Sequence, residues 1–241
     1  MEYSEFKALL CAALQKNKLS TPTEAQCEAF YRFTTLLMEA NSTTNLTAIR
    51  NIPDVLYKHY VDSLLASEHI PFNATVLDIG CGPGFPSIPL AIWRPDLTIT
   101  ALDSTAKKIA FVQTVQKELH LSNLTAIAGR AEDTTMRKSI GLVDVVTSRA
   151  VARLNVLSEL CLPYVKIGGK LVALKGAKAA EELAEAENAI KTLGASDATL
   201  VDTYLATEEE NEARGIIIIP KKSPTPAKYP RPYAAILKKP L

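Results

Sequence analysis

The sequence lacks the features that mark disulfide-rich, metal-binding and membrane proteins. Its four cysteines are scattered without a C-x-x-C pair, and it has only three histidines, so neither a disulfide framework nor a metal site is expected. No apolar run approaches the roughly 18 residues that a membrane span requires. The first residues show neither the basic segment nor the apolar stretch of a secretory signal. We therefore expect a cytoplasmic protein without a metal ion.

The chain also has almost no excess of positive over negative charge. The formal net charge of +1 does not by itself indicate a nucleic-acid-binding protein. The charges are unevenly placed, however, because residues 221–241 contain six basic side chains and no acid, whereas acids gather at 181–187 and 208–212. The length of 241 residues and the 47% hydrophobic content fit one α/β domain with an appendage.

The amino-terminal part has helical patterns. Thr21-Pro22-Thr23-Glu24 has the pattern of a capping box with proline at the first helical position, which predicts a helix over residues 22–40. Apolar residues at helical spacing predict a helix around residues 6–14 and another that begins at Pro53. The polar residues 41–45 are expected to form a loop between them.

From about residue 74 onward, short β-branched runs alternate with helical patterns. The expected strands lie at 75–79, 97–102, 124–128, 143–147, 170–174, 198–205 and 214–219, and the expected helices between them at 87–93, 105–119, 154–162 and 177–192. Such alternation predicts a Rossmann-like α/β fold, with a mostly parallel seven-stranded sheet covered by helices on both faces. We expect an N-terminal helical extension (1–70), a core (71–220) and a basic C-terminal tail (221–241).

A glycine-rich loop, Asp78-Ile79-Gly80-Cys81-Gly82-Pro83-Gly84-Phe85, ends the first strand. Glycines permit positive φ and a close approach of the backbone to a ligand, and ligands of open α/β sheets bind at this carboxyl edge. Asp103 closes the second strand 23 positions after Gly80, where its carboxylate can accept both hydroxyls of an adenosine ribose. Glu132 follows the third strand, where an adenine amino group would lie.

Two cofactor classes compete for this loop. A dinucleotide-binding enzyme usually has G-x-G-x-x-G, but the third glycine position is Phe85 here. Asp78 also favours a cationic sulfonium, because a carboxylate beside the loop would repel a pyrophosphate. We therefore predict a class I methyltransferase that binds S-adenosylmethionine, with Asp78, Gly80, Gly82 and Gly84 around the cofactor.

The residues after the fourth strand narrow the chemistry. Thr147-Ser148-Arg149-Ala150 is not the Asn/Asp-Pro-Pro-Tyr/Phe motif that enzymes acting on exocyclic amines present there. Cys161 lies in an apolar helical pattern, which indicates a buried thiol and not a nucleophile. Guanine N7 has a free lone pair and needs no deprotonation, so in-line transfer without a general base is predicted. Arg149 and His59 are candidates for positioning the substrate. Arg149 could instead form a salt bridge to a neighbouring acid, and His59 could instead be a half-buried helix residue without a role in catalysis.

Together these motifs give a specific resemblance. From about Phe30 to Lys239 the chain resembles the bacterial 16S ribosomal RNA guanine-N7 methyltransferases, a family also called glucose-inhibited division protein B. The segments that carry the resemblance are Asn45–Thr47, His59–Leu64, Val76–Pro89, Leu102–Ser104, Lys107–Lys108, Arg130–Glu132, Ser148–Ala150, Leu174–Gly176 and Lys228–Arg231. The resemblance implies that the following residues contact the cofactor: Gly80, Phe85, Asp103, Ser104, Ala131, Glu132 and Arg149.

The chain departs from the family pattern at two places. Cys81 stands where the family commonly has threonine or serine, a small change that leaves cofactor binding intact. Residues 232–236 replace the usual glycine-containing stretch before the final lysines, which puts a role of the tail in RNA binding in doubt.

Cations are needed to neutralise RNA phosphates. The candidates for contacts with RNA are Asn45, Lys58, Lys107, Lys108, Lys175, Lys221, Lys222, Lys228 and Arg231. The small net charge predicts modest affinity for free RNA, so structured 16S ribosomal RNA or the small ribosomal subunit is the expected partner of a monomeric enzyme. Two alternatives stay open: a methyltransferase of small molecules or proteins, and a non-catalytic regulatory protein that binds the same cofactor.

Overall fold

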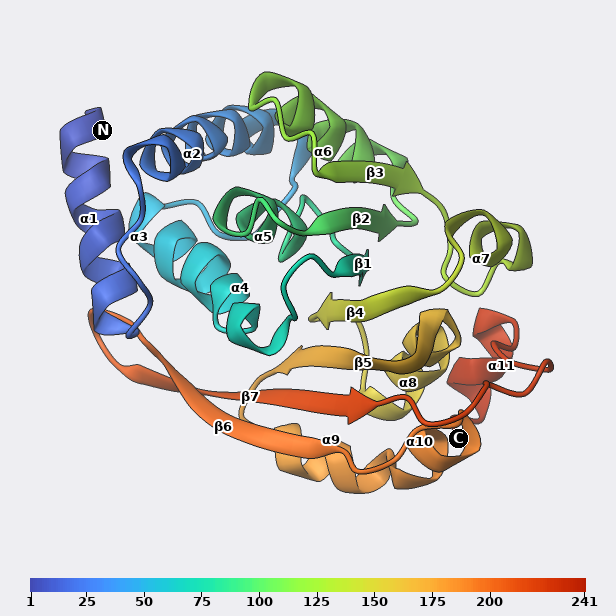
Figure 1. Ribbon diagram of the computed structural model, residues 1–241. Helices are drawn as coiled ribbons and strands as arrows, with labels where there is room; N and C mark the ends of the chain where they lie inside the picture. Colours follow the sequence, from blue (N-terminus) through green and yellow to red (C-terminus); the bar gives the residue numbers. More distant parts are fainter.

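The computed structural model describes residues 1–241 and contains one seven-stranded sheet, with strand order β3-β2-β1-β4-β5-β7-β6 (Figure 1). The strands are β1 (Thr75–Ile79), β2 (Thr98–Asp103), β3 (Leu124–Ala128), β4 (Val143–Arg149), β5 (Val165–Lys175), β6 (Thr199–Ala206) and β7 (Asn211–Pro220). Strands β1 to β5 pair in parallel, and β7 runs antiparallel between β5 and β6. The predicted mostly parallel sheet is confirmed.

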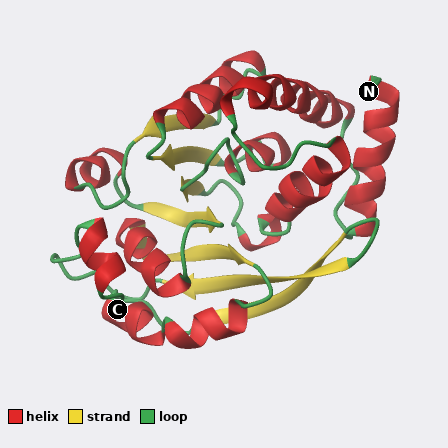
Figure 2. Cartoon of the chain, turned by 180° about the vertical axis from the view of Figure 1, so that it is seen from behind, coloured by secondary structure: helices red, strands yellow, loops and turns green.

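Helices cover both faces of the sheet, as the view from behind also shows (Figure 2). The helical segments are α1 (Tyr3–Lys16), α2 (Glu24–Thr44), α3 (Ile52–Asp54), the π-helix η1 (Val55–Val61), α4 (Asp62–Leu64), the 3-10 turn η2 (Ser67–His69), α5 (Ser87–Trp93), α6 (Ala106–Glu118), α7 (Thr134–Ile140), α8 (Leu154–Cys161), the 3-10 turn η3 (Leu162–Tyr164), α9 (Ala179–Glu185), α10 (Glu187–Thr192) and α11 (Tyr233–Lys238). None of these helices has both the length and the apolar character needed to cross a lipid bilayer.

The alternation of side chains along the strands divides the core into two hydrophobic clusters. Val76 of β1 belongs to the cluster shared with α1, α2, α5 and α6, and its neighbour Leu77 belongs to the cluster shared with α8 to α11. Successive strand residues point to opposite faces, so a central strand must be apolar on both sides. Phe6, Phe30 and Phe33 of the first two helices are fully buried in the first cluster. Residues 1–70 therefore share the core of the sheet.

The structure corrects two expectations for α2. The helix begins at Glu24 with Thr23 as N-cap, and the capping box joins Thr23 to Gln26, so the box predicted at residues 21–24 was wrong by two positions. The helix also continues to Thr44, where a loop was expected. Asn41 is buried at that end of the helix. Its Oδ1 accepts hydrogen bonds from the backbone N–H groups of Leu46 (2.7 Å) and Thr47 (2.9 Å), so the buried amide is paired. This polar side chain fixes the turn that leads to the site.

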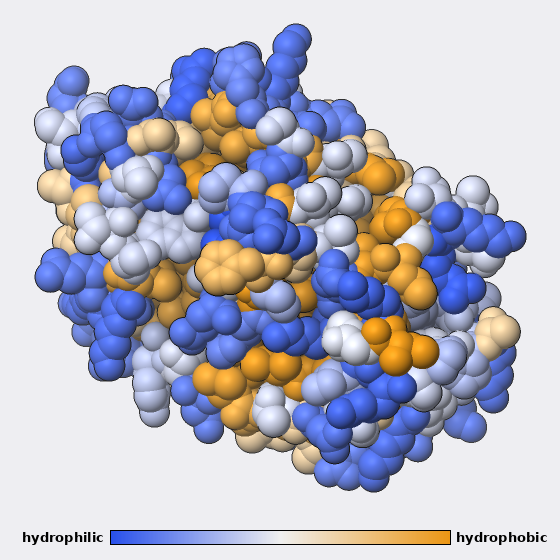
Figure 3. Space-filling model, in the orientation of Figure 1, coloured by the Kyte–Doolittle hydropathy of each residue, from blue (hydrophilic) through white to orange (hydrophobic).

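Short helices α7 and α11 were not expected. Helix α7 has no buried residue, and α11 buries only Ile236, so neither has the apolar periodicity that predicts a helix. On the face of the molecule seen in Figure 3, hydrophobic side chains occupy separate areas between hydrophilic ones.

Candidate functional site

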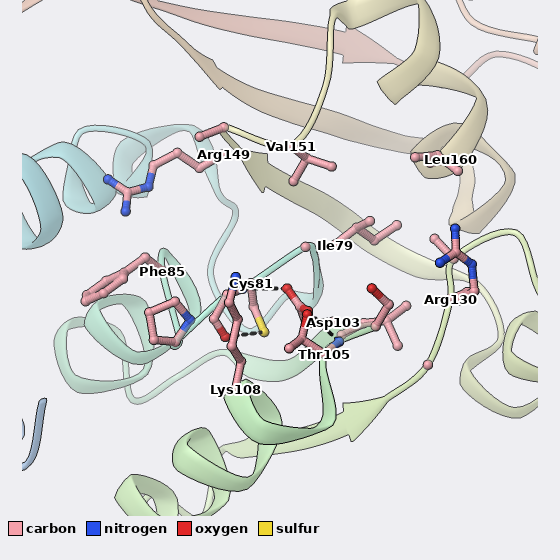
Figure 4. Close-up of a pocket in the computed structure, with 18 of the residues that line it drawn as sticks. Ile79, Cys81, Phe85, Asp103, Thr105, Lys108, Arg130, Arg149, Val151 and Leu160 are labelled. Atoms are coloured by element: carbon pink, nitrogen blue, oxygen red, sulfur yellow. Dashed lines mark hydrogen bonds between the residues drawn. The ribbon is translucent and has the colours of Figure 1, made fainter. Parts of the chain in front are cut away.

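A cleft of about 440 Å³ opens where β1, β2, β3 and β4 end (Figure 4). It lies beside the point where the strand order reverses between β1 and β4, which is the usual ligand position in such sheets. Its volume is within the range of small-molecule sites. The expected residues that line it are His59, Gly80, Gly82, Phe85, Asp103, Ser104, Lys108, Ala131, Glu132 and Arg149.

The glycine loop forms the floor of this cleft. Gly80 has φ +73°, and an added Cβ would lie 2.3 Å from Cγ2 of Val151, so only glycine fits between the loop after β1 and the loop after β4. Gly82 has φ +57°, and no atom lies within 4 Å of the position of its missing Cβ. The backbone there is bare toward the cleft and leaves room for a ligand.

Asp103 is held in a fixed orientation at the end of β2. Its Oδ2 accepts the N–H of Gly82 at 2.9 Å, and its Oδ1 accepts the N–H of Thr105 at 2.8 Å. Each carboxylate oxygen has a second lone pair, and the side chain is only partly buried. The carboxylate can therefore accept two further hydroxyl hydrogen bonds from a ribose, as the sequence predicts for an adenosine cofactor.

An apolar slot of the cleft lies beyond Asp103. Leu102 and Ala131 line it together with Leu160 of α8 and Tyr233 of α11. Arg130 donates to Glu132, and its guanidinium carbon lies 5.0 Å from the centre of the Tyr233 ring. Sequence reasoning missed Leu160 and Tyr233, because no local pattern indicates that α8 and the tail return to this edge of the sheet.

Three side chains form the opposite end of the cleft. The rings of His59 and Phe85 are stacked, with centres 4.1 Å apart. The Nη1 of Arg149 donates to the carbonyl of Lys58 at 2.7 Å and to Asp62 Oδ2 at 2.8 Å, and its Nη2 lies 3.1 Å from Nδ1 of His59. Figure 4 shows the guanidinium turned toward the helical layer and away from Asp103. Arg149 thus lines the cleft. It also forms a salt bridge, to Asp62, which was the alternative expected for it in place of a contact with the substrate or cofactor.

His59 is neutral at physiological pH. Burial, reinforced by the positive charge of Arg149, lowers its pKa to about 3. Since a guanidinium can only donate, Nδ1 must accept from Arg149, and this assigns the ring proton to Nε2. Nε2 lies 2.9 Å from Oγ1 of Thr47, to which it donates. Both ring nitrogens are therefore occupied by protein groups.

Asp78 and Gly84 lie beneath the cleft and do not line it. Asp78 is fully buried, its Oδ2 accepts the N–H of Ser87 at 3.1 Å, and burial raises its pKa to about 7. Alternation along β1 turns this side chain toward α5 and away from the loop surface. An added Cβ at Gly84 would lie 2.2 Å from Cδ1 of Ile88, so this glycine permits close packing of α5. Both residues support the loop from below.

Three of the expected RNA-binding cations are engaged inside the protein. Lys175 is buried and donates to the carbonyl of Ala152 and to Glu182. Lys221 is also buried, and its Nζ donates to the carbonyl of Leu162 at 3.0 Å. Arg231 forms an ion pair at 2.6 Å with the fully buried Glu159. These expectations are corrected, since burial and internal partners leave Lys175 and Lys221 unable to reach a phosphate and commit Arg231 to Glu159.

The other candidates are more accessible. Asn45, Lys107 and Lys228 are exposed, Lys108 is partly exposed at the cleft, and Asn45 has φ +47° after the end of α2. Lys58 pairs with Asp54 at 3.0 Å and with Glu212 at 3.6 Å, and Lys222 pairs with Asp197 at 3.0 Å. Exposed pairs of this kind exchange readily with solvent and with phosphates.

Comparison with known proteins gives a consistent result. A family model described as rRNA small subunit methyltransferase G matches residues 26–210. The chain is 47% identical over 222 residues to the ribosomal RNA small subunit methyltransferase G of Brevibacillus brevis, covering 91% of this chain and 92% of that protein. The protein of the same name from Clostridium botulinum is 40% identical over 241 residues, covering 98% and 99%. The resemblance deduced from the motifs is confirmed.

A solved structure supports the fold. The O-methyltransferase from Bacillus cereus in complex with SAH aligns with a TM-score of 0.58 and 16% identity, covering 91% of this chain and all of that one. At this identity the likeness concerns the fold alone, and it confirms the predicted Rossmann-like fold of class I methyltransferases.

Proposed function

The chain belongs to the rRNA small subunit methyltransferase G family, and we propose that it methylates N7 of one specific guanine in 16S ribosomal RNA. S-adenosylmethionine, bound in the cleft, supplies the electrophilic methyl group of its sulfonium. Asp103 and Ser104 would hold the ribose, Ala131 and Glu132 the adenine, and the bare backbone from Gly80 to Gly82 the amino-acid part.

The observation that supports N7 as the target is that neither His59 nor a nearby cysteine is a usable base or nucleophile. His59 has a pKa of about 3, and both its nitrogens are engaged. Burial raises the pKa of the Cys81 and Cys161 thiols, so neither is a thiolate. A pyrimidine carbon would need such a nucleophile, and an exocyclic amine would need the acceptors of the Asn/Asp-Pro-Pro-Tyr/Phe motif, which does not follow β4. Guanine N7 already has the lone pair that attacks the methyl carbon.

The chain's own residues then contribute position and environment. The stacked pair His59 and Phe85, fixed by Arg149, forms a rigid wall at the end of the cleft opposite the adenine slot. A rigid wall favours in-line approach, because a reaction without proton transfer gains most from alignment of the reacting atoms. Arg149 and His59 are therefore positioning residues in this proposal.

We further propose that RNA is bound through the accessible polar residues around the cleft mouth, in the cytoplasm, where the small ribosomal subunit is found. Lys107 and Lys108 begin α6 next to Asp103, and the Nζ of Lys107 lies 3.4 Å from the carbonyl of Thr44. These cations, with Asn45, Lys58 and Lys228, would neutralise phosphates on either side of the target nucleotide.

The proposal is tested by methyl transfer from radiolabelled S-adenosylmethionine to small-subunit ribosomal RNA from a strain that lacks the endogenous enzyme. We expect label that is released as 7-methylguanine. Gly80→Trp should abolish cofactor binding and transfer, because the side chain would fill the space between the two loops. Gly168→Trp is the matched control, since Gly168 also has positive φ (+83°) but has open space around it and lies outside the cleft.

Label on another base or another atom of guanine would refute N7 as the target. Cofactor binding without any transfer to RNA would favour the small-molecule, protein or regulatory alternatives.

A further inference from the structure

A second hollow of about 450 Å³ adjoins the cofactor cleft. The two share Arg149, the last residue of β4, and Ala150 and Val151, which follow it. The far side of the second hollow is formed by other elements, namely Lys175 and Gly176 at the end of β5 and Glu182 of α9. A ligand in this hollow would therefore approach the cleft across the loop after β4.

Most charged groups of the second hollow are already paired. Asp62 accepts one charged hydrogen bond on each oxygen, from Arg149 at 2.8 Å and from Arg214 at 2.7 Å. Arg214 also donates to Glu212, and Lys175 donates to the carbonyl of Ala152. These groups leave little hydrogen-bonding capacity for a ligand.

Glu182 differs from them. Its Oε2 accepts the N–H of Leu154 at 2.9 Å and the ammonium of Lys175 at 2.7 Å, which fixes the carboxylate in one orientation. Its Oε1 has no hydrogen-bond partner within the chain and is open to solvent, and the side chain is 17% exposed. Glu182 lines the second hollow, and an oxygen that accepts nothing from the chain can accept a hydrogen bond from a ligand there.

Guanine supplies such a donor on the required side. When N7 faces the cofactor cleft, the N1–H and the 2-amino group lie on the opposite edge of the ring and point to the far side of the hollow. Adenine has an unprotonated N1 on that edge, whose lone pair would oppose a carboxylate.

We propose that the second hollow receives the target guanine and that Glu182 selects guanine over adenine by accepting hydrogen bonds from its N1–H and 2-amino group. This inference rests on the proposed N7 transfer and adds the residue that determines base specificity.

The test combines a conservative variant with a change in the base. Glu182→Gln keeps the shape and the cap for Leu154 but turns an amide N–H₂ toward the hollow. Glu181→Gln is the matched control, because Glu181 is exposed and pairs only with Arg153 at 3.2 Å. The RNA carries either guanine or inosine, which lacks the 2-amino group, at the modified position, introduced by splinted ligation after that position has been located.

The readouts are kcat/KM for RNA and the dissociation constant for S-adenosylmethionine. Wild type and Glu181→Gln should methylate the inosine RNA about 10-fold less efficiently than the guanine RNA. Glu182→Gln should lose about 10- to 100-fold on guanine and show a guanine-to-inosine ratio near one. Its affinity for the cofactor should stay within about twofold of wild type, since Glu182 does not line the cofactor cleft.

Two results would overturn the inference in different ways. If Glu182→Gln loses activity but keeps the wild-type preference for guanine over inosine, or loses no activity, Glu182 is structural and only the specificity role fails. If wild type places no methyl group on N7 of any guanine, the proposed function fails and the inference falls with it.

Discussion

Single side chains in this site have more partners than their positions in the sequence indicate. Arg149 binds Asp62, His59 and the carbonyl of Lys58 at once, and it forms this network across the gap between β4 and the π-helix η1. These contacts need the several donors of a planar guanidinium, and a lysine ammonium could not reproduce them. Interactions of this kind hold the end of the cleft in one shape before any substrate arrives.

Asp103 provides the most direct test of cofactor binding. Asp103→Asn should weaken binding of S-adenosylmethionine by about 10- to 100-fold, because an amide replaces one of the two acceptors that face the ribose and the loop. Isothermal titration calorimetry would measure the dissociation constant. Asp133→Asn is a suitable control, since Asp133 caps α7 through a hydrogen bond of 2.7 Å to Thr135 but lies outside the cleft. Unchanged affinity in Asp103→Asn would contradict the assignment.

We expect the lowered pKa of His59 to make the stability of the fold depend on pH. Its folded pKa of about 3 lies below the ordinary value of 6.5, so between these values the unfolded chain binds more protons and the free energy of unfolding falls as the pH falls. Lowering the pH from 7.5 to 5 should cost wild type about 2 kcal/mol more than His59→Gln, which does not titrate. Urea unfolding at the two pH values measures this difference. Equal losses in both proteins would mean that His59 titrates normally.

At the scale of elements, local patterns predicted the strands well. β1 and β3 begin and end at the expected residues, because short β-branched runs between turn signals are a local property. The expected loop at 41–45 was wrong, since the tertiary position of Asn41 lets polar residues continue the helix. Helix α7 was missed for the related reason that a helix without a buried face has no apolar period.

The tail shows how an element is held by one buried contact. Arg231 pairs with Glu159, whose side chain is fully buried on α8, and α11 then places Tyr233 in the cofactor cleft. Arg231→Ala should lower the free energy of unfolding by about 3 kcal/mol, because it leaves a buried carboxylate without a partner. It should also weaken cofactor binding through Tyr233. Denaturant unfolding and calorimetry would measure the two effects.

Lys222→Ala is the control for this prediction. Its pair with Asp197 is exposed on both sides, and loss of such a pair costs at most about 1 kcal/mol. If both variants behaved alike, the tail would not depend on the buried pair.

For the whole molecule, the helices of residues 1–70 act as part of the methyltransferase core. They share one hydrophobic cluster with the sheet, and they also supply Leu46, Thr47 and His59 to the cleft. The same packing brings Asp62 and Arg214 together, which closes the second hollow from the amino-terminal side. The two hollows are therefore lined by segments that are far apart in the chain.

The overall charge predicts the form of the substrate. The 27 Lys and Arg residues are nearly balanced by 26 Asp and Glu, and Lys175 and Lys221 are held internally, so the surface has little net positive charge to attract phosphates. We expect kcat/KM to be at least about 10-fold higher on assembled small subunits or full-length 16S RNA than on a short oligonucleotide containing the target guanine, because shape must replace charge in recognition. Filter binding of the radiolabelled product would measure these rates, and equal rates would argue against recognition of a folded RNA.

The sequence by itself determined the fold class and the family, and it predicted the glycine loop that lines the cleft. These depend on features that are local in the chain: glycines where positive φ is needed, an acid after the second strand, and the alternation of strands with helices. It could not determine which charged residues face the solvent. Lys175, Lys221 and Arg231 are residues of the type that binds RNA phosphates. Only the packing of distant segments showed that they are paired inside the protein. The same packing decided that Glu182 keeps one oxygen unpaired beside the cleft, because the burial and partners of a charge are set by elements that meet only in three dimensions.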